Sequence, residues 1–340
     1  MAIKDINGTP VDESNLPTVR LDQLRAGNNA ESKKLLEACR IHGFFYLDLT
    51  SDPKLCNDWE ELLAIMKQYF NQPLDIKMQD ARGSDNTGYE PSGTEVGPKA
   101  GTRDGYESVK FSRREFLNKE LELTTPLKDH TEFIFDFIEQ AHGCTMMMLE
   151  KLSDEMGRKG DDRFEVFHSD AKPSLSNLAV LMYPKHNEAE PDKVGHNKHT
   201  DIGSLTFLLP KQWGLQILST QTGQWEFVTP RPGHAVINVG DSLHFPSERK
   251  LVSVVHRVIP LHEKQEEDRY SIAYFLRVND DLRWTDANGN AWSAKEWHDF
   301  KFDAFRSPDA MENGMSILTG EMEDNDVLRN HVTQNTFVAA

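Results

Sequence analysis

The feature that most constrains the fold is a series of short β-branched and aliphatic runs between Ser176 and Val278. The runs cover residues 178–183, 205–209, 215–218, 225–228, 235–239, 253–259 and 270–278. Turn-forming residues separate them, at Gly195, Gly214, Thr222-Gly223, Pro232-Gly233 and Gly240-Asp241. Short strands with regular turn signals are typical of an antiparallel sandwich or barrel. The sequence therefore predicts a mainly β core in this part of the chain.

The residues on either side of this core follow other patterns. A short strand and turn are predicted at 17–26, helices at 31–41, 54–70, 129–156 and 294–305, and a buried strand at 44–47. The segment 82–103 is rich in Gly, Pro, Ser and Thr, and a loop of that length is usually functional. We predict three regions: a helical and mixed α/β region at 1–170, the β core at 171–280, and a C-terminal helix and tail at 281–340 that pack on the core.

Composition narrows the classes of partner. The net charge of -17 argues against nucleic-acid binding, which needs a positive face. No run of eighteen apolar residues predicts a membrane span, and the first residues lack the apolar run of a signal peptide. The three cysteines, Cys39, Cys56 and Cys144, have neither disulfide-framework nor zinc-knuckle spacing. We expect a cytoplasmic protein that acts on a small molecule, and the sequence predicts no particular oligomeric state.

Three side chains within the β core form a candidate metal site. His199 and Asp201 lie two residues apart, so in an extended segment they point to the same side. A His-x-Asp triplet alone is usually surface polar sequence, and a lone histidine in the apolar run 253–259 would usually be a core residue. Together with His256, however, the triplet supplies the two imidazoles and one carboxylate of a facial triad for divalent iron. We call His199, Asp201 and His256 the facial triad.

An arginine follows the triad on the next predicted strand. Arg269 and Ser271 are two residues apart and share a face. A guanidinium and a neighbouring hydroxyl suit the carboxylate of a co-substrate. The alternative is that Arg269 pairs with Glu266 or Glu267 in the acidic segment before it. Because Arg269 and Ser271 lie on the predicted strand that comes directly after the strand of His256, we favour a carboxylate-binding role.

The order of these motifs resembles that of the Fe(II)/2-oxoglutarate-dependent dioxygenases of the isopenicillin N synthase-like family. The matching segments are 177–184 ending in Tyr-Pro, 199–209, 213–218, Trp225, 232–241, 253–258 and 269–271. A weaker match, over 35–46, resembles the first helix and strand of the family. The resemblance implies a double-stranded β-helix, or jelly roll, with helices packed on one side.

The resemblance also implies roles for individual residues. The facial triad would bind Fe(II), and Arg269 and Ser271 would hold the distal carboxylate of 2-oxoglutarate, which Tyr183 would also reach. Leu181 stands where plant members usually have asparagine, so this sequence departs from the family on that side of the co-substrate site.

The residues expected around the substrate come from several segments. Phe275 matches a family aromatic residue that faces the substrate. Tyr106 and Arg103, in the segment 82–110, are expected to form a wall of the pocket together with Phe207 and the C-terminal helix. Asn238, Gly240 and Asp241 are interpreted as a structural turn, because all three residue types tolerate tight-turn backbone angles.

The activity that the resemblance implies is oxidation of an unactivated C–H bond of a small organic molecule, by hydroxylation, desaturation or ring formation, in specialised metabolism. O2 and 2-oxoglutarate would be consumed and succinate and CO2 released, while the protein positions the reactants. Two alternatives stay open. One is an oxidase of the same fold that does not use 2-oxoglutarate, since such relatives retain the Arg-x-Ser pair. The other is a barrel that binds zinc and a water with the same three ligands.

Overall fold

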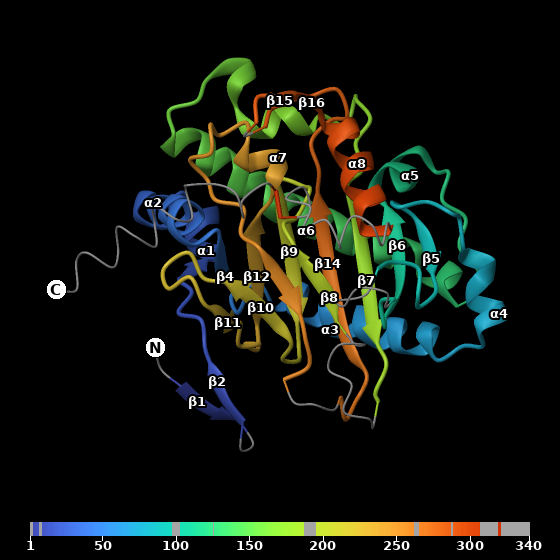
Figure 1. The fold of residues 1–340 in the computed structure, drawn as a ribbon. Helices are drawn as coiled ribbons and strands as arrows, with labels where there is room; N and C mark the ends of the chain where they lie inside the picture. The colour runs from blue at the N-terminus through green and yellow to red at the C-terminus, as the bar shows by residue number, and fades with distance from the viewer. Residues whose placement is uncertain are drawn as a thin grey trace.

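Two sheets form the centre of the protein (Figure 1), for which a computed structural model describes residues 3–6, 9–96, 103–124, 126–186, 195–261, 265–286, 288–306 and 319–320. The major sheet has the strand order β3 (Thr18–Arg20), β4 (Phe44–Asp48), β12 (His234–Val239), β9 (Leu205–Pro210), β14 (Arg269–Leu276), β7 (Asn177–Tyr183), β6 (Glu107–Ser112) and β5 (Gly88–Glu90). The minor sheet has the order β11 (Trp225–Phe227), β10 (Leu215–Leu218), β13 (His256–Val258) and β8 (His196–His199). Neighbouring strands are antiparallel except for β3 and β4. The predicted mainly β, jelly-roll architecture is confirmed.

Helices cover the outer face of the major sheet. The two longest, α3 (Pro53–Phe70) and α6 (Thr131–Glu155), share one hydrophobic core with that sheet, and Figure 1 shows α6 behind its strands. The other helices are α1 (Leu21–Arg25), α2 (Asn29–Glu37) with a π-helical turn at Ala38–His42, α4 (Leu74–Lys77), α5 (Arg113–Asn118), α7 (Asp241–His244) and α8 (Ala294–Arg306). Short 3-10 turns lie at Met78–Asp80, Leu127–His130, Gly160–Asp162 and Phe164–His168. Two small hairpins, β1 (Ile3–Ile6) with β2 (Thr9–Asp12) and β15 (Arg283–Thr285) with β16 (Ala291–Ser293), complete the set.

Side-chain alternation along the strands separates the core from the interior of the jelly roll. On β14, Tyr270, Ile272 and Tyr274 belong to the core shared with the helices. Ser271 and Phe275, at the alternate positions, line a cavity between the two sheets. The two-residue repeat of a strand therefore directs every second residue of β14 toward the functional interior.

The described elements agree with most of the predicted ones, and the differences include the following. Residues 21–25 form helix α1 where a turn was expected, because Leu21 and Leu24 bury on one side of it. The segment 82–103 contains strand β5 and a bridge between Val96 and Arg103. Only residues 256–258 of the run 253–259 form a strand.

The N-terminal residues supply part of the major sheet. Strands β3, β4, β5 and β6 lie in it beside strands from the core region, so the division into three regions stays a prediction. The last part of the predicted C-terminal tail, residues 321–340, lies outside the described residues. Among the helices that the structure describes, none is long and apolar enough to cross a membrane.

Gly240, between β12 and α7, allows a close backbone approach that we expect to be essential for stability. A Cβ there would lie 2.3 Å from the carbonyl oxygen of Gly203 and 2.8 Å from that of Asp201. We therefore expect Gly240→Ala to lower the free energy of unfolding by about 3 kcal/mol, measured by urea denaturation. Gly143 in α6 is the control, because its Cβ would meet no atom within 4 Å; Gly143→Ala should raise stability by up to about 1 kcal/mol. Equal effects of the two substitutions would contradict this account.

Candidate active site

The facial triad converges at one end of the minor sheet. His199 ends β8, His256 begins β13, and the two histidines face each other across these paired strands. Asp201 lies two residues beyond β8. Its Oδ1 is 3.5 Å from His199 Nε2 and 3.6 Å from His256 Nε2. One potential ligand atom from each side chain lies within 4.8 Å of the others, and all three residues are buried. This spacing fits a single metal ion held on one side.

Backbone hydrogen bonds orient both imidazoles. His199 Nδ1 lies 2.6 Å from the carbonyl oxygen of Asn197, and His256 Nδ1 lies 3.1 Å from that of Val254. Because a carbonyl can only accept, each Nδ1 carries the proton, and each Nε2 presents its lone pair to the space between the three side chains. Metal-binding histidines are commonly fixed by such a bond from the second nitrogen.

Asp201 is held as a carboxylate by two donors behind it. Asn238 Nδ2 donates to Oδ2 over 2.7 Å, and the Thr206 hydroxyl donates to the same oxygen, which leaves Oδ1 for the space between the histidines. Burial raises the pKa of Asp201, but attraction to the imidazoles of His256 and His199 when these carry a proton, together with the Asn238 hydrogen bond, holds the pKa well below its usual range. A metal cation at the same place would favour the carboxylate in the same way. The sequence pattern indicates a turn at Asn238 and does not predict this contact. Its position on the inner face of β12, opposite Thr206, was the available signal.

The electrostatics of the triad favour a metal cation. Burial, reinforced by His199, lowers the pKa of His256 to about 4, so this imidazole is neutral at neutral pH. A neutral imidazole and an ionised carboxylate are the protonation states that metal binding requires. The residues present therefore fit Fe(II), for which two imidazoles and one carboxylate are a known ligand set.

Arg269 lies on the inner face of β14, fixed by neutral partners. Its Nε donates to the carbonyl oxygen of Trp213 over 2.9 Å, and its Nη1 donates to the Ser271 hydroxyl over 2.9 Å. The Tyr183 ring centroid, from the adjacent strand, is 5.0 Å from Arg269 Cζ. No ion pair joins Arg269 to Glu266 or Glu267, all of which the structure describes. The positive charge of the Arg269 guanidinium is therefore not neutralised by Glu266 or Glu267 and is available to bind an anion.

Gly214 makes room for this arginine. Its φ is +136°, and a Cβ there would lie 2.8 Å from Arg269 Nε and 3.1 Å from the carbonyl oxygen of Ile259. A side chain at this position would displace the guanidinium. Trp213 therefore positions Arg269 through its carbonyl oxygen, which accepts from Nε. Gly214 leaves the space that the guanidinium occupies, because it has no side chain.

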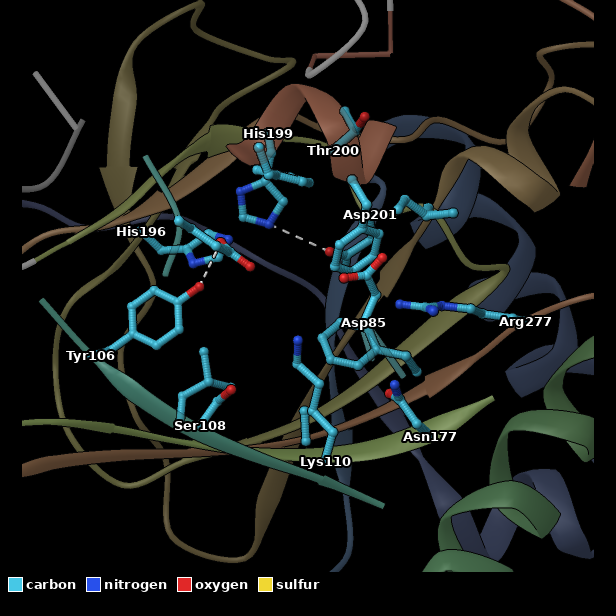
Figure 2. Close-up of a pocket in the computed structure, with 17 residues that line it drawn as sticks. Asp85, Tyr106, Ser108, Lys110, Asn177, His196, His199, Thr200, Asp201 and Arg277 are labelled. Carbon is cyan, nitrogen blue, oxygen red and sulfur yellow. Dashed lines mark hydrogen bonds and ion pairs between the residues drawn. The ribbon is translucent and has the colours of Figure 1, made fainter. Parts of the chain in front are cut away.

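The facial triad lies where two cavities meet. The first, which we call the Arg269 cavity, spans about 560 Å³ including space open to solvent, and is lined by the triad together with Tyr183, Leu181, Arg269, Ser271 and Phe275 among others. The second, the Arg277 cavity, spans about 620 Å³ including space open to solvent, and its lining includes His199, Asp201, Tyr106, Lys110, Asn177, Phe275, Arg277, Phe302 and Phe305. His199 and Asp201 line both cavities. Figure 2 shows the labelled side chains of the Arg277 cavity around a common space.

The predicted substrate residues divide into two groups. Tyr106 and Phe275 line the Arg277 cavity, and the Tyr106 hydroxyl donates to Glu95 Oε2 over 2.7 Å. Phe207 does not reach it: β9 alternation sends Thr206 inward and turns Phe207 into the helix-covered core, so this prediction is corrected. Arg103 is exposed and lines neither cavity, because its bridge to Val96 holds it at the protein surface.

Helix α8 is anchored to the loop of the triad by a buried ion pair. Lys301 Nζ lies 2.6 Å from Asp241 Oδ2 and 2.6 Å from Thr200 Oγ1, and Thr200 stands between two triad residues. Lys301 and Asp241 are both fully buried. The predicted turn residue Asp241 therefore also ties the C-terminal helix to the site.

Removing the Lys301 charge should leave the buried Asp241 carboxylate without its counter-ion, although Ser253 and Trp297 still donate hydrogen bonds to it. We expect Lys301→Met to lower the free energy of unfolding by about 3–5 kcal/mol. The matched control on the same helix is Lys295→Met, whose partner Asp299 is about half exposed; it should change stability by no more than about 0.5 kcal/mol. Chemical denaturation of both variants measures the difference, and a Lys301 effect as small as that of Lys295 would show that the pair does not anchor α8.

Comparison with known proteins agrees with this geometry. Residues 174–278 match the 2OG-Fe(II) oxygenase superfamily, and residues 16–132 match the family described as non-haem dioxygenase in morphine synthesis N-terminal. The 2-oxoglutarate-dependent dioxygenase gloE of Glarea lozoyensis is 48% identical over 314 residues, which cover 92% of this chain and 95% of that protein. The chain belongs to the Fe(II)/2-oxoglutarate-dependent dioxygenases.

Further relatives of this dioxygenase agree. The 2-oxoglutarate-dependent dioxygenase frbH of Dothideomycetidae sp. is 47% identical over 92% of the chain and 97% of its own length. The crystal structure of a full-length Neurospora crassa protein in complex with alpha-KG superposes with a TM-score of 0.70 at 22% identity, covering 86% of this chain and 97% of that one, and so shows the same fold.

Family membership settles what the enzyme uses. The protein is an oxidoreductase that requires Fe(II), 2-oxoglutarate and O2, as the resemblance had implied. The zinc-binding barrel and the oxidase without 2-oxoglutarate lose their support, since the fungal relatives gloE and frbH are named 2-oxoglutarate-dependent dioxygenases.

Proposed function

We propose that this dioxygenase oxidises an unactivated C–H bond of a small organic molecule bound in the Arg277 cavity, in specialised metabolism. The observation that carries the proposal is the position of the facial triad at the junction of two cavities. One cavity contains Arg269, Ser271 and Tyr183, which suit the carboxylate of 2-oxoglutarate, and the other, which His199 and Asp201 also line, is available to a substrate.

We assign iron binding to the facial triad. The two Nε2 atoms and Asp201 Oδ1 are its free ligand atoms, because the remaining polar atoms of these side chains already have partners. When bound, the iron supplies the chemistry that couples the decarboxylation of 2-oxoglutarate by O2 to oxidation of a C–H bond. Asn238 acts as a positioning residue, since its side-chain amide donates to Asp201 Oδ2 and thereby orients the carboxylate.

We assign 2-oxoglutarate binding to Arg269, Ser271 and Tyr183. Arg269 is only 4% exposed and has no carboxylate partner among the described residues. A bound anion would therefore neutralise its buried positive charge. Ser271 and Tyr183 add hydroxyls beside the guanidinium. Leu181, which lines both cavities, leaves that side of the site apolar.

Aromatic side chains form part of the wall on the substrate side of the triad. Aromatic side chains from β14 and α8, Phe275, Phe302 and Phe305, line the Arg277 cavity, and α8 also contacts the loop after β5 through the bond from Val96 N to the carbonyl oxygen of Phe305. Polar contacts beside these aromatic side chains are strengthened, because the rings displace water from their surroundings. The protein thus binds, orients and shields the reactants.

Succinate formation tests the proposed function most directly. Purified enzyme loaded with Fe(II) and supplied with 2-oxoglutarate, O2 and ascorbate, which donates the two electrons that a C–H substrate would otherwise supply, should release succinate and CO2 in equal amounts, and Zn(II) in place of Fe(II) should abolish both. Oxygen uptake without succinate would instead support the oxidase alternative. Zinc-dependent hydrolysis with no oxygen uptake would support the zinc barrel. The cytoplasmic location stays a prediction, which fractionation of producing cells would test.

A further inference from the structure

A buried arginine in the Arg277 cavity lacks the partner that its burial requires. Arg277 lies just beyond the end of β14 and is 8% exposed. Its Nε and Nη1 atoms are covered from solvent and have no hydrogen-bond acceptor among the described residues. Burial lowers the pKa of Arg277 only to about 10, so the group is charged at neutral pH. A buried charge without a partner is costly and uncommon in proteins.

The neighbouring carboxylates do not explain this charge. Asp85 forms an ion pair with Arg306, and Asp201 is held by Asn238 and Thr206 as part of the triad. Glu95 accepts from Tyr106. None of these acids makes a hydrogen bond with the Arg277 guanidinium, which rests instead near the rings of Phe275 and Phe302, 5.8 and 5.7 Å from their centroids. The cation therefore faces the cavity with donors unused.

Lys110, the other cation in the lining, differs in this respect. Its Nζ lies 2.5 Å from Glu90 Oε2, and both side chains are largely buried. Its charge is already compensated within the protein. Of these two cations, Arg277 is the one whose charge no described side chain neutralises through a hydrogen bond or ion pair.

A second orphaned polar atom faces the same cavity. Asn177 donates its Nδ2 to the carbonyl oxygen and Oδ1 of Asn86, at 3.2 and 2.8 Å, while its own Oδ1 is buried without a partner. Figure 2 shows Arg277 and Asn177 on the same side of the cavity. The other polar side chains of this wall that are named above, Asp85, Glu95, Lys110 and Asp201, already have partners within the protein. Two unused polar groups side by side are therefore the pattern of a small, orienting polar subsite.

We infer that the primary substrate of this dioxygenase carries a carboxylate that binds Arg277, an inference that rests on the proposed function and names its substrate class. A carboxylate is planar and its two oxygens match two guanidinium N–H groups. A single negative charge also fits better than a phosphate, because it matches the one uncompensated positive charge of Arg277 in this lining. The bound carboxylate would fix the carbon chain against the aromatic wall, with one C–H bond directed toward the triad.

The test uses full-length enzyme loaded anaerobically with Fe(II), 2-oxoglutarate and nitric oxide, whose electron paramagnetic resonance spectrum reports a substrate beside the metal. The probes are short straight-chain carboxylic acids, with and without an α-amino group, each compared with its uncharged primary amide and with the matching alkyl phosphate. At least one carboxylate should change the spectrum at concentrations where its amide and phosphate do not. Equal binding of the amide or the phosphate, or no change with any carboxylate, would overturn the inference.

Two variants locate the effect at Arg277. Arg277→Gln should weaken binding of the active carboxylate by about tenfold or more, and Arg277→Lys should weaken it less, since the charge stays while the planar group is lost. Arg283→Gln, an exposed arginine on β15, is the matched control and should bind like wild type. Unchanged binding in Arg277→Gln would overturn the inference. The absorption band of 2-oxoglutarate on iron, recorded before any probe is added, should persist in all variants; its absence in wild type would mean that the proposed function itself has failed.

Discussion

Replacing Asp201 by alanine is expected to abolish Fe(II) binding at micromolar concentrations and to lower the rate of succinate formation by about 1,000-fold or more. The substitution removes the only carboxylate among the three ligands and leaves Asn238 Nδ2 and the Thr206 hydroxyl pointing at an apolar methyl group. Anaerobic equilibrium dialysis measures the bound iron, and quantification of succinate measures the rate.

The matched control for this variant is Asp161→Ala. Asp161 is an exposed acid in a short 3-10 turn and lies in neither cavity. The Asp161→Ala variant should bind iron and form succinate as the wild-type enzyme does. Iron binding retained in Asp201→Ala would show that the metal is held elsewhere and would remove the basis of the proposed function.

The second large effect is expected at Arg269. Arg269→Met keeps the length of the side chain and removes its charge, so we expect the KM for 2-oxoglutarate to rise by about 10- to 100-fold, the equivalent of one lost charge-assisted contact. Iron binding in the absence of 2-oxoglutarate should be unchanged, since Arg269 makes no contact with the triad. Initial rates at varied 2-oxoglutarate concentration measure the effect.

Arg257 on β13 provides the comparison for this variant. It neighbours His256 in sequence, but its Nε donates to Gln216 Oε1 and its guanidinium lies 4.1 Å from the Trp225 ring centroid, outside both cavities. Arg257→Met should therefore leave the KM for 2-oxoglutarate within about twofold of wild type. A similar rise in both variants would mean that general positive charge, and not the fixed guanidinium of Arg269, attracts the co-substrate.

The parts of the fold that sequence analysis predicted are those in which periodicity and burial agree. Strands such as β14 combine β-branched and aromatic residues with turn signals, and α6 has a long apolar stripe, so the pattern identifies each of them. Strand β6 was not predicted, because Glu107, Ser108 and Lys110 make it polar in sequence although it is mostly buried in the structure. Its polar residues take buried partners, such as Glu90 for Lys110, that are distant in sequence.

The candidate site was predicted where spacing alone brings residues together. His199 with Asp201, and Arg269 with Ser271, lie two apart on extended segments, so each pair shares a side. Phe207 was predicted wrongly because a strand residue can face either side, and only the pairing of β9 with its neighbours decides which. Arg277 was not predicted as a site residue because its distinguishing property, burial without a partner, exists only in three dimensions.

The measurement that tests the central claim most directly is an anaerobic titration of the metal-free protein with Fe(II) and then 2-oxoglutarate, followed by visible absorption. We expect a weak charge-transfer band from the chelated keto acid in wild type, no band in His199→Ala, and a weakened band in Arg269→Met. Iron binding without a band would contradict the assignment of 2-oxoglutarate to the Arg269 cavity. Failure of wild-type protein to bind iron would contradict the facial triad itself.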